Sequence, residues 1–147
     1  MELRRAIIDD AIDILKWRND PIAVSMSKSA ATVDESEHLR WFAHAIQDPN
    51  RVLFVAADGG RKIGMVRFDL EGDAWTVSLN IAPHHRNKGY GRKVLEGAVS
   101  ALLAANGHCQ VVAEIREDNA ASLRLFRKCG FVVQGHDNGL CRLSRAI

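Results

Sequence analysis

Three strand-like segments joined by two glycine turns restrict the fold of this chain more than any other feature. The segments span residues 51–57, 61–70 and 75–81, and the turns between them read DGG and EGD. Glycine adopts the positive φ that tight turns between antiparallel strands require. The third segment, WTVSLNI, alternates apolar and polar residues, which predicts a core face and a polar face. We therefore expect a hairpin followed by a third antiparallel strand.

The N-terminal third is expected to supply one more strand and two helices. A strand is predicted at 3–8, and a helix at 9–19 ends before a proline. Residues 21–32 are expected to form a loop or an irregular helix. Thr32 and Glu35 match a T-x-x-E capping box in front of an amphipathic helix.

The C-terminal half alternates helices and strands. The helix after the third strand carries an apolar stripe and is expected to end at Asn106-Gly107. The further predicted elements are a strand at 110–116, a helix capped by Asp118 or Asn119, and strands at 131–134 and 140–145. We predict a single α+β domain over residues 1–147, with a central mixed, mostly antiparallel twisted sheet and helices on both faces.

Composition excludes several classes of protein. A net charge of +2, with basic and acidic residues interspersed, argues against a nucleic-acid partner. No apolar run reaches the roughly 18 residues that a membrane span needs, and the N-terminus has no signal-peptide pattern, so we expect a cytoplasmic protein. The three cysteines and six histidines lack metal-ligand spacing, so no metal site is predicted.

The segment RNKGYG, residues 86–91, is an R-x-x-G-x-G string between a strand and a long helix. The first turn of a helix exposes free N–H groups, and glycines let the backbone close around an anion. Arg86, Lys88 and Arg92 add positive charge, which suits a ligand with several phosphates. Neither a P-loop nor a dinucleotide-binding motif is present. The alternative is that the glycines form a tight turn and the basic residues a solvated face.

With this loop, the chain resembles the GNAT superfamily of acetyltransferases along nearly its whole length. The resemblance rests on VSLNIAPHHRNKGYGR, on AEIREDNAASLRLFRKCGF and on the hairpin before them. It implies acetyl-CoA as the cosubstrate and a possible homodimer. It also implies cofactor contacts by the backbone of Asn80, Ile81 and Ala82 along the pantetheine arm, by Arg86, Asn87, Lys88, Gly89, Tyr90, Gly91 and Arg92 at the pyrophosphate, and by Asn119, Ser122 and Phe126 further along.

Glu114 is the candidate catalytic base. Acetylation requires a neutral amine, and most amines are protonated at pH 7. Glu114 lies on the polar side of its strand, and AEIR resembles the LEVR of ribosomal-protein alanine acetyltransferases, so we expect it to act through a water. The alternative is a carboxylate paired with Arg116 or Arg124.

Phe126 stands where the family commonly has a tyrosine that protonates the departing thiolate. Phenylalanine has no proton to donate, so water would have to supply it. On this interpretation, Phe126→Tyr raises turnover. The same departure motivates a second interpretation, a non-catalytic acyl-CoA-binding module.

Trp17, Arg18 and Asn19 are the candidate substrate residues. The string WRNDP resembles acetyltransferases that modify amino-sugar nucleotides in pseudaminic-acid biosynthesis and, more distantly, those that acetylate ribosomal-protein N-termini. Arg18 and Asn19 are expected to contact sugar or phosphate oxygens, and Trp17 to stack on a ring. The resemblance implies a small-molecule primary amine as acceptor. The alternative for these three residues is helix capping and core packing.

Overall fold

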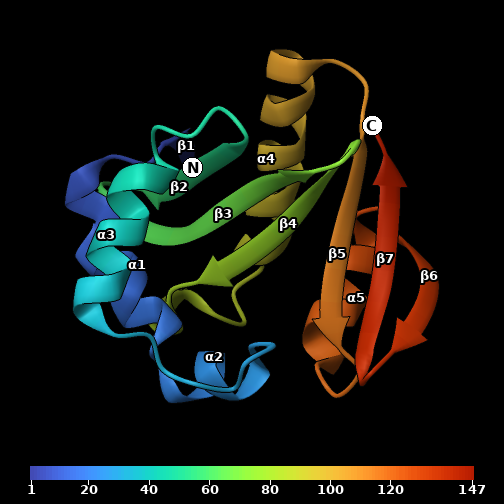
Figure 1. Ribbon diagram of the computed structural model, residues 1–147, viewed down its shortest axis with the longest axis horizontal. Coiled ribbons are helices and arrows are strands. Elements are labelled where there is room, and N and C mark those ends of the chain that lie inside the picture. The colour runs from blue at the N-terminus through green and yellow to red at the C-terminus, as the bar shows by residue number, and fades with distance from the viewer.

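The computed structural model describes residues 1–147 and contains a seven-stranded sheet with helices on both faces (Figure 1). The strand order is β1-β2-β3-β4-β5-β7-β6, and every neighbouring pair is antiparallel except β4 and β5. This confirms the predicted α+β class. The strands are β1 (Glu2–Arg5), β2 (Arg51–Asp58), β3 (Arg61–Glu71), β4 (Ala74–Ile81), β5 (Gln110–Arg116), β6 (Val132–Asp137) and β7 (Leu140–Ala146). The helices are α1 (Ala11–Arg18), α2 (Pro21–Met26), α3 (Glu35–Ala45), α4 (Tyr90–Asn106) and α5 (Ala120–Lys128), with short 3₁₀ turns η1 (Ile8–Asp10) and η2 (Pro83–His85).

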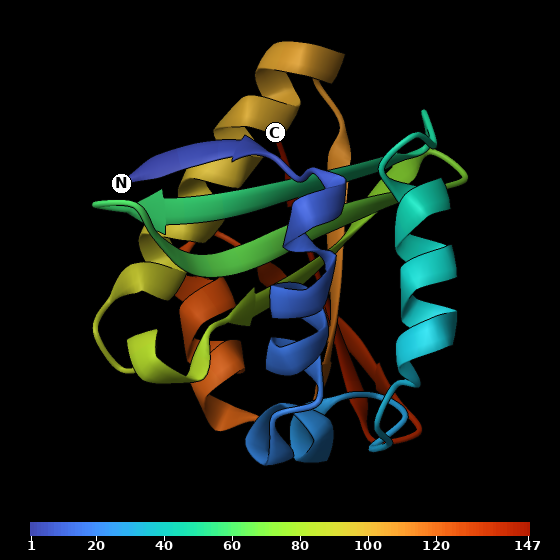
Figure 2. The same cartoon turned by 90° about the vertical axis from the view of Figure 1, so that its left-hand side faces the viewer.

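Two hydrophobic clusters lie on opposite faces of the sheet. Helices α1 and α3 cover one face, where Trp17 and Phe42 pack with Leu53 and Val55 of β2 (Figure 2). Helices α4 and α5 cover the other face, and their side chains pack on the alternate residues of the same strands. The period of two along each strand thus lets the central strands serve both clusters.

The predicted hairpin and third strand are confirmed. Gly59 and Gly60 form the turn with φ of 57° and 80°, and Gly72 has φ of 63° in the next turn. In β4, Val77 is buried against the α4 side while Ser78 is only partly buried. The apolar stripe of α4 is fully buried, and the helix ends at Gly107 as predicted.

Two N-terminal boundaries differ from the prediction. The first strand ends at Arg5 instead of residue 8, because the Ile7 N–H donates to the Asp10 side chain and the chain turns away from the sheet. Helix α3 is capped by Asp34, whose Oδ2 accepts the Glu37 N–H at 3.1 Å, and not by Thr32.

Asn19 explains why the capping box at Thr32 does not form. Its side chain accepts the Val33 N–H at 2.7 Å and donates to the Val33 carbonyl at 2.8 Å. Val33 is therefore held outside the helix, which can begin only two residues later. The segment 21–32, expected as a loop or irregular helix, contains the six-residue α2, with Asp20 as its N-cap and Pro21 as its first residue. None of the helices combines the length and the apolar composition needed to cross a bilayer.

Candidate functional site

Strands β4 and β5 separate along their length. They pair in parallel only from Ala74 to Thr76 of β4, opposite Gln110 to Val112 of β5. Figure 1 shows the two strands together at one end and far apart at the other. Beyond Thr76, the edge of β4 that faces β5 has no strand partner. A row of main-chain N–H and C=O groups is therefore open to an extended ligand, which can bind there as an added strand would.

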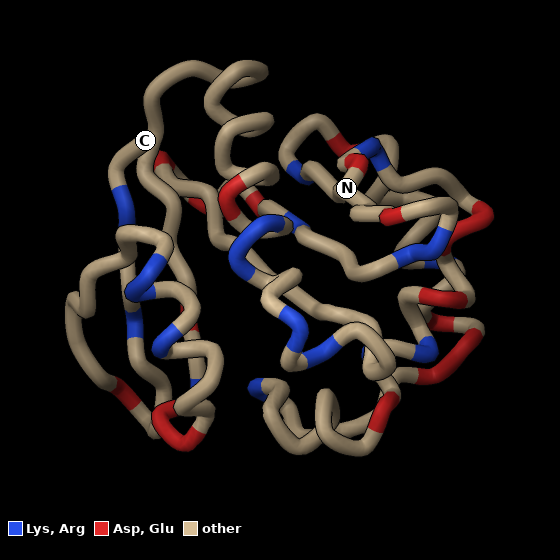
Figure 3. Tube along the Cα trace, turned by 180° about the vertical axis from the view of Figure 1, so that it is seen from behind, with Lys and Arg blue, Asp and Glu red and all other residues tan.

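The loop after β4 is shaped by left-handed residues and leads into α4. Asn87 has φ of 60° and Gly89 has φ of 80°. Gly89 is the N-cap of α4, where no side chain caps the free N–H groups and no acidic residue lies in the first turn. Residues 82–95 include Arg86, Lys88, Arg92 and Lys93 and no Asp or Glu, and the tube seen from behind shows blue segments where the chain enters this helix (Figure 3). Free N–H groups, the positive end of α4 and the exposed Lys88 fit a diphosphate.

Arg86 does not direct its charge into this loop. Its Nη1 donates to Asp20 Oδ2 at 2.7 Å, and its Nε donates to the Ile81 carbonyl at 3.1 Å. The Arg86 hydrogen bond lowers the pKa of Asp20 from its ordinary value. In this structure the Arg86 side chain ties the end of β4 to the start of α2, and its predicted pyrophosphate contact stays a prediction.

Ala82 also departs from its predicted role. Its N–H donates to the Ile63 carbonyl at 2.8 Å, and its carbonyl accepts the His85 N–H at 2.9 Å. Both polar backbone groups already have partners because the chain leaves β4 here and enters η2. The predicted pantetheine contact by the Ala82 backbone is therefore corrected, while the contacts by Asn80 and Ile81, where the chain is still in β4, stay predictions.

The side chains of Tyr90 and Arg92 have partners outside the loop. The Tyr90 hydroxyl donates to Asp58 Oδ2 at 3.0 Å, which raises the pKa of Tyr90, and its ring packs edge-on against His85. Arg92 pairs with Glu96 one turn along α4 at 3.0 Å, and both side chains are largely exposed. An exposed pair of this kind is weak, so Arg92 remains free to turn toward an anion.

The three predicted cofactor residues on α5 and at its N-cap differ in exposure and in their contacts. Asn119 caps the helix by accepting the Ser122 N–H at 3.3 Å, as one of the two predicted caps. Ser122 is partly exposed in the first turn. Phe126 is only 4% exposed and packs edge-on against Phe131, with ring centroids 5.0 Å apart. Its predicted cofactor contact is therefore corrected, because the ring belongs to the core beneath α5.

Glu114 lies on the face of β5 opposite Ala113 and Ile115, whose side chains enter the core with α4 and α5. Its side chain is 28% exposed, and Oε1 lies 3.2 Å from Nζ of Lys28 in the segment after α2. Neither predicted alternative partner is used, since Arg116 pairs with Asp118 at 2.8 Å and Arg124 makes no ion pair. The carboxylate is thus partly accessible and holds a primary ammonium group.

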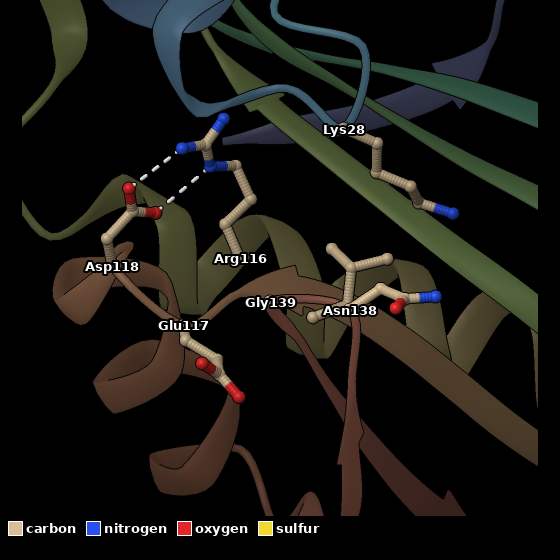
Figure 4. A pocket seen from close by; sticks show the side chains of 7 residues that line it. Lys28, Arg116, Glu117, Asp118, Asn138 and Gly139 are labelled. Carbon is tan, nitrogen blue, oxygen red and sulfur yellow. Dashed lines mark hydrogen bonds and ion pairs between the residues drawn. The ribbon is translucent and has the colours of Figure 1, made fainter.

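A polar cavity of about 410 Å³ lies beside Lys28 at the C-terminal end of β5. Figure 4 shows Lys28 on one side and Glu117, Asn138 and Gly139 on the other. This volume lies in the range of small-molecule sites. Lys28 lines the cavity and also contacts Glu114, which does not itself line the cavity.

The three predicted substrate residues have different roles. Trp17 is 9% exposed and packs in the cluster between α1, α3 and the sheet, so its predicted stacking on a substrate is corrected. Asn19 uses both polar atoms of its amide on Val33, so its predicted substrate contact is corrected as well. Arg18 keeps a donor without a partner: Nη2 donates to Ser29 Oγ at 3.1 Å, but Nη1 has no partner in the protein.

Lys28 and Asp20 are contacts of the site that the sequence reasoning missed. Lys28 lies in a segment without periodicity, and no sequence signal places it beside Glu114. The Asp20-Pro21 dipeptide did carry a signal, since an acidic N-cap followed by proline is a typical helix start.

Comparison with known proteins agrees with this geometry. Residues 1–132 match the family model of the acetyltransferase (GNAT) domain. The chain belongs to the GNAT acetyltransferases. Acetyl-CoA is the cosubstrate of this family, and the separated β4 and β5, with the uncapped start of α4, fit its pantetheine arm and pyrophosphate.

Two curated GNAT relatives are each 33% identical over 108 residues, which is 69% of this chain. One is the L-methionine sulfoximine/L-methionine sulfone acetyltransferase of Salmonella typhimurium, and the other is the L-amino acid N-acyltransferase MnaT of Escherichia coli. The matched part spans 62% of the length of each relative.

Among solved structures, the spermidine N-acetyltransferase of Vibrio cholerae in complex with CoA and spermine superposes with a TM-score of 0.85. It is 22% identical, and the match covers 99% of this chain and 94% of that one. The ribosomal-protein-alanine N-acetyltransferase of Brucella melitensis has a TM-score of 0.82 at 23% identity, with both chains covered fully. At these identities the likeness establishes the GNAT fold.

Proposed function

We propose that this protein transfers the acetyl group of acetyl-CoA to the primary amine of a small molecule, with Glu114 as the general base. The observation that carries the proposal is the separation of β4 from β5. It leaves a free strand edge on β4 that leads to the uncapped start of α4, and Glu114 lies on the strand across the opening. Within the GNAT family, this arrangement supports an active acetyltransferase.

The chain's own groups divide into those that hold the cosubstrate and those that handle the amine. The backbone of Asn80 and Ile81 would bind the pantetheine arm, and the N–H groups around Gly89, with Lys88, would bind the pyrophosphate. Asn119 and Ser122 remain candidates further along. When bound, acetyl-CoA supplies an acetyl thioester, which is already activated toward an amine.

The contact between Lys28 and Glu114 supports the role of Glu114. A lysine side chain ends in a primary ammonium group, and Nζ lies 3.2 Å from the carboxylate. The site therefore accommodates the chemical group that an acceptor would present. An acceptor amine that takes the place of Nζ would lose its proton to Glu114, directly or through a water, before it attacks the thioester.

The acceptor class is the finer part of the proposal. An amino-sugar nucleotide is supported by the WRNDP resemblance, although of its residues only Arg18 keeps donors for a ligand. An acceptor amino acid is supported by the names of the two relatives at 33% identity. A peptide N-terminus rests on the AEIR resemblance.

A non-catalytic acyl-CoA-binding module is the second candidate function. The observation that favours it is Phe126, which places no hydroxyl where the family commonly has a tyrosine. Because phenylalanine has no acidic hydrogen, the chain offers no acid from this position. Protonation of the thiolate is then left to water, which is adequate for a leaving thiol with a pKa of about 8.5.

A thiol-release assay with acetyl-CoA against amino acids, amino sugars, polyamines and short peptides tests the proposal. Glu114→Gln is expected to lower kcat by about 10²- to 10⁴-fold, the range of general-base catalysis, while CoA affinity by calorimetry stays unchanged. Glu71→Gln is the matched control, because Glu71 is an exposed strand carboxylate at the end of β3 and has no ion pair. Full activity of Glu114→Gln would remove its role. CoA binding without thiol release from any amine would favour the non-catalytic module.

A further inference from the structure

Arg18 carries a guanidinium whose charge has no anionic partner in the protein. It is the last residue of α1 and is partly buried. Its Nη1 is buried without a hydrogen-bond partner in the protein, and Nη2 donates only to the neutral hydroxyl of Ser29 at 3.1 Å. No carboxylate forms an ion pair with Arg18. A buried cation of this kind is costly unless an anion joins it.

A second positive charge, that of Arg67, lies near the Arg18 guanidinium. Burial lowers the pKa of the Arg18 guanidinium, and the nearby charge of Arg67 acts in the same direction. Arginine nevertheless stays protonated in proteins, so the charge persists. Arg67 has its own partners, since it pairs with Asp69 at 2.9 Å and stacks on the Trp41 ring at 5.1 Å. Arg18 is therefore the cation here that still lacks an anion.

Two consecutive residues link Arg18 to Glu114. Lys28 places its ammonium on Glu114, and Ser29 places its hydroxyl on Arg18. Both residues are exposed and lie in the segment between α2 and α3. One short stretch of the chain, Lys28-Ser29, thus contacts both the carboxylate of Glu114 and the guanidinium of Arg18, through an amine and a hydroxyl oxygen.

From this pairing we propose that the acceptor carries an anionic oxygen group on the same molecule as its amine. Arg18 binds the anionic group, and Glu114 binds the amine, so the acceptor displaces Ser29 and Lys28 from these contacts. The inference rests on the proposed function of Glu114. A carboxylate and a phosphate share the chemistry that a guanidinium recognises, because both accept two parallel N–H···O bonds. An uncharged amino sugar or a polyamine lacks the group.

Matched acceptors separate the two sources of the anion. L-Methionine sulfone and its carboxamide differ only in the carboxylate, and glucosamine 6-phosphate and glucosamine differ only in the phosphate. Wild-type protein is expected to favour one anionic member over its neutral counterpart by about 10- to 100-fold in kcat/KM, the worth of one charged hydrogen-bonding pair. The amine of a carboxamide is the less basic one, so a preference for the acid cannot come from amine ionisation. Spermidine serves as the test acceptor that has amines but no anionic group.

Arg18→Gln is expected to abolish this preference, because kcat/KM for the anionic member falls toward that of the neutral counterpart. Arg18→Lys is expected to keep part of it, because the charge remains while the second N–H bond is lost. Arg40→Gln, an exposed arginine of α3 without an ion pair, is the matched control and should behave as wild type.

Equal kcat/KM for the anionic and neutral members of both pairs, or a preference for spermidine, would overturn the inference. So would a preference that survives in Arg18→Gln. Calorimetric binding of the same acceptors in the presence of coenzyme A tests Arg18 without catalysis. If Arg18-dependent binding of the anionic member is seen but no thiol is released, the inference holds and the proposed function fails.

Discussion

Replacement of Asp10 by Asn is expected to destabilise the protein strongly, because Asp10 is a fully buried carboxylate that joins three segments. Its two oxygens accept hydrogen bonds from both terminal nitrogens of Arg4, at 2.8 and 2.9 Å, and from the Ile7 N–H at 2.8 Å. Lys62 Nζ also lies 2.8 Å from one of them. Burial by itself would raise the pKa of Asp10, but the hydrogen bonds from Arg4, Ile7 and Lys62 outweigh it and hold the pKa well below its usual range. The charged form is therefore the stable one in the folded protein.

The magnitude follows from this network. Removal of one member of a buried ion pair costs about 3–5 kcal/mol, because the remaining charges lose their counterion. Asparagine would also turn an N–H₂ group toward Arg4 or Lys62. For a domain of this size, 1 kcal/mol lowers Tm by about 2–4 °C, so Asp10→Asn should lower Tm by roughly 6–20 °C. A loss of this size is a large part of a typical total stability of about 5–15 kcal/mol.

Asp13→Asn is the matched control. Asp13 contacts the same Lys62 nitrogen at 2.9 Å, but its side chain is 44% exposed, so its loss should cost about 1 kcal/mol or less. Urea unfolding followed by circular dichroism at pH 7 gives both free energies. If Asp10→Asn cost less than about 1 kcal/mol, or no more than Asp13→Asn, the reasoning on the buried network would be refuted.

The pH dependence of the difference in unfolding free energy between wild type and Asp10→Asn provides a second check. A carboxyl group with a lowered pKa in the folded state stabilises the protein fully above its unfolded pKa of about 3.9. This contribution is lost as the pH falls from that value toward the lower folded pKa. The free-energy gap between wild type and Asp10→Asn should therefore be constant between pH 7 and pH 5 and shrink below pH 4. A gap that grows on acidification would contradict the assignment.

Two further substitutions test how the site is positioned. Gly64→Ala would place a Cβ 2.7 Å from the backbone oxygen of Asn80, so β3 or β4 must shift at a cost of about 1–3 kcal/mol in stability. Gly135→Ala is the control: its Cβ meets nothing within 4 Å, so thermal unfolding should be nearly unchanged. Asp34→Ala removes the α3 cap and should lower the free energy of unfolding in urea by about 0.5–2 kcal/mol, while Thr32→Ala should lower it by almost nothing. Equal losses in the two variants would support the capping box predicted at Thr32 instead.

The sequence by itself determined the elements whose signals are local. The glycine turns, the alternation in β4, the stripe of α4 and the Asn119 cap all depend on residues within a few positions of each other. The loop at residues 86–91, which we propose binds phosphate, belongs to this group, since its glycines and the helix start are adjacent in the chain. These features together predicted the fold and the acetyl-CoA-dependent family.

Tertiary structure alone decided which side chains are available to a ligand. Arg86 is paired with Asp20 across 66 positions, and Lys28 reaches Glu114 across 86. Trp17 and Arg18 are neighbours in sequence, yet the helix turns Trp17 into the core and leaves Nη1 of Arg18 without a hydrogen-bond partner. Residue type and spacing do not encode these outcomes, because partners and burial depend on how distant segments pack, and that packing is set by the whole sheet.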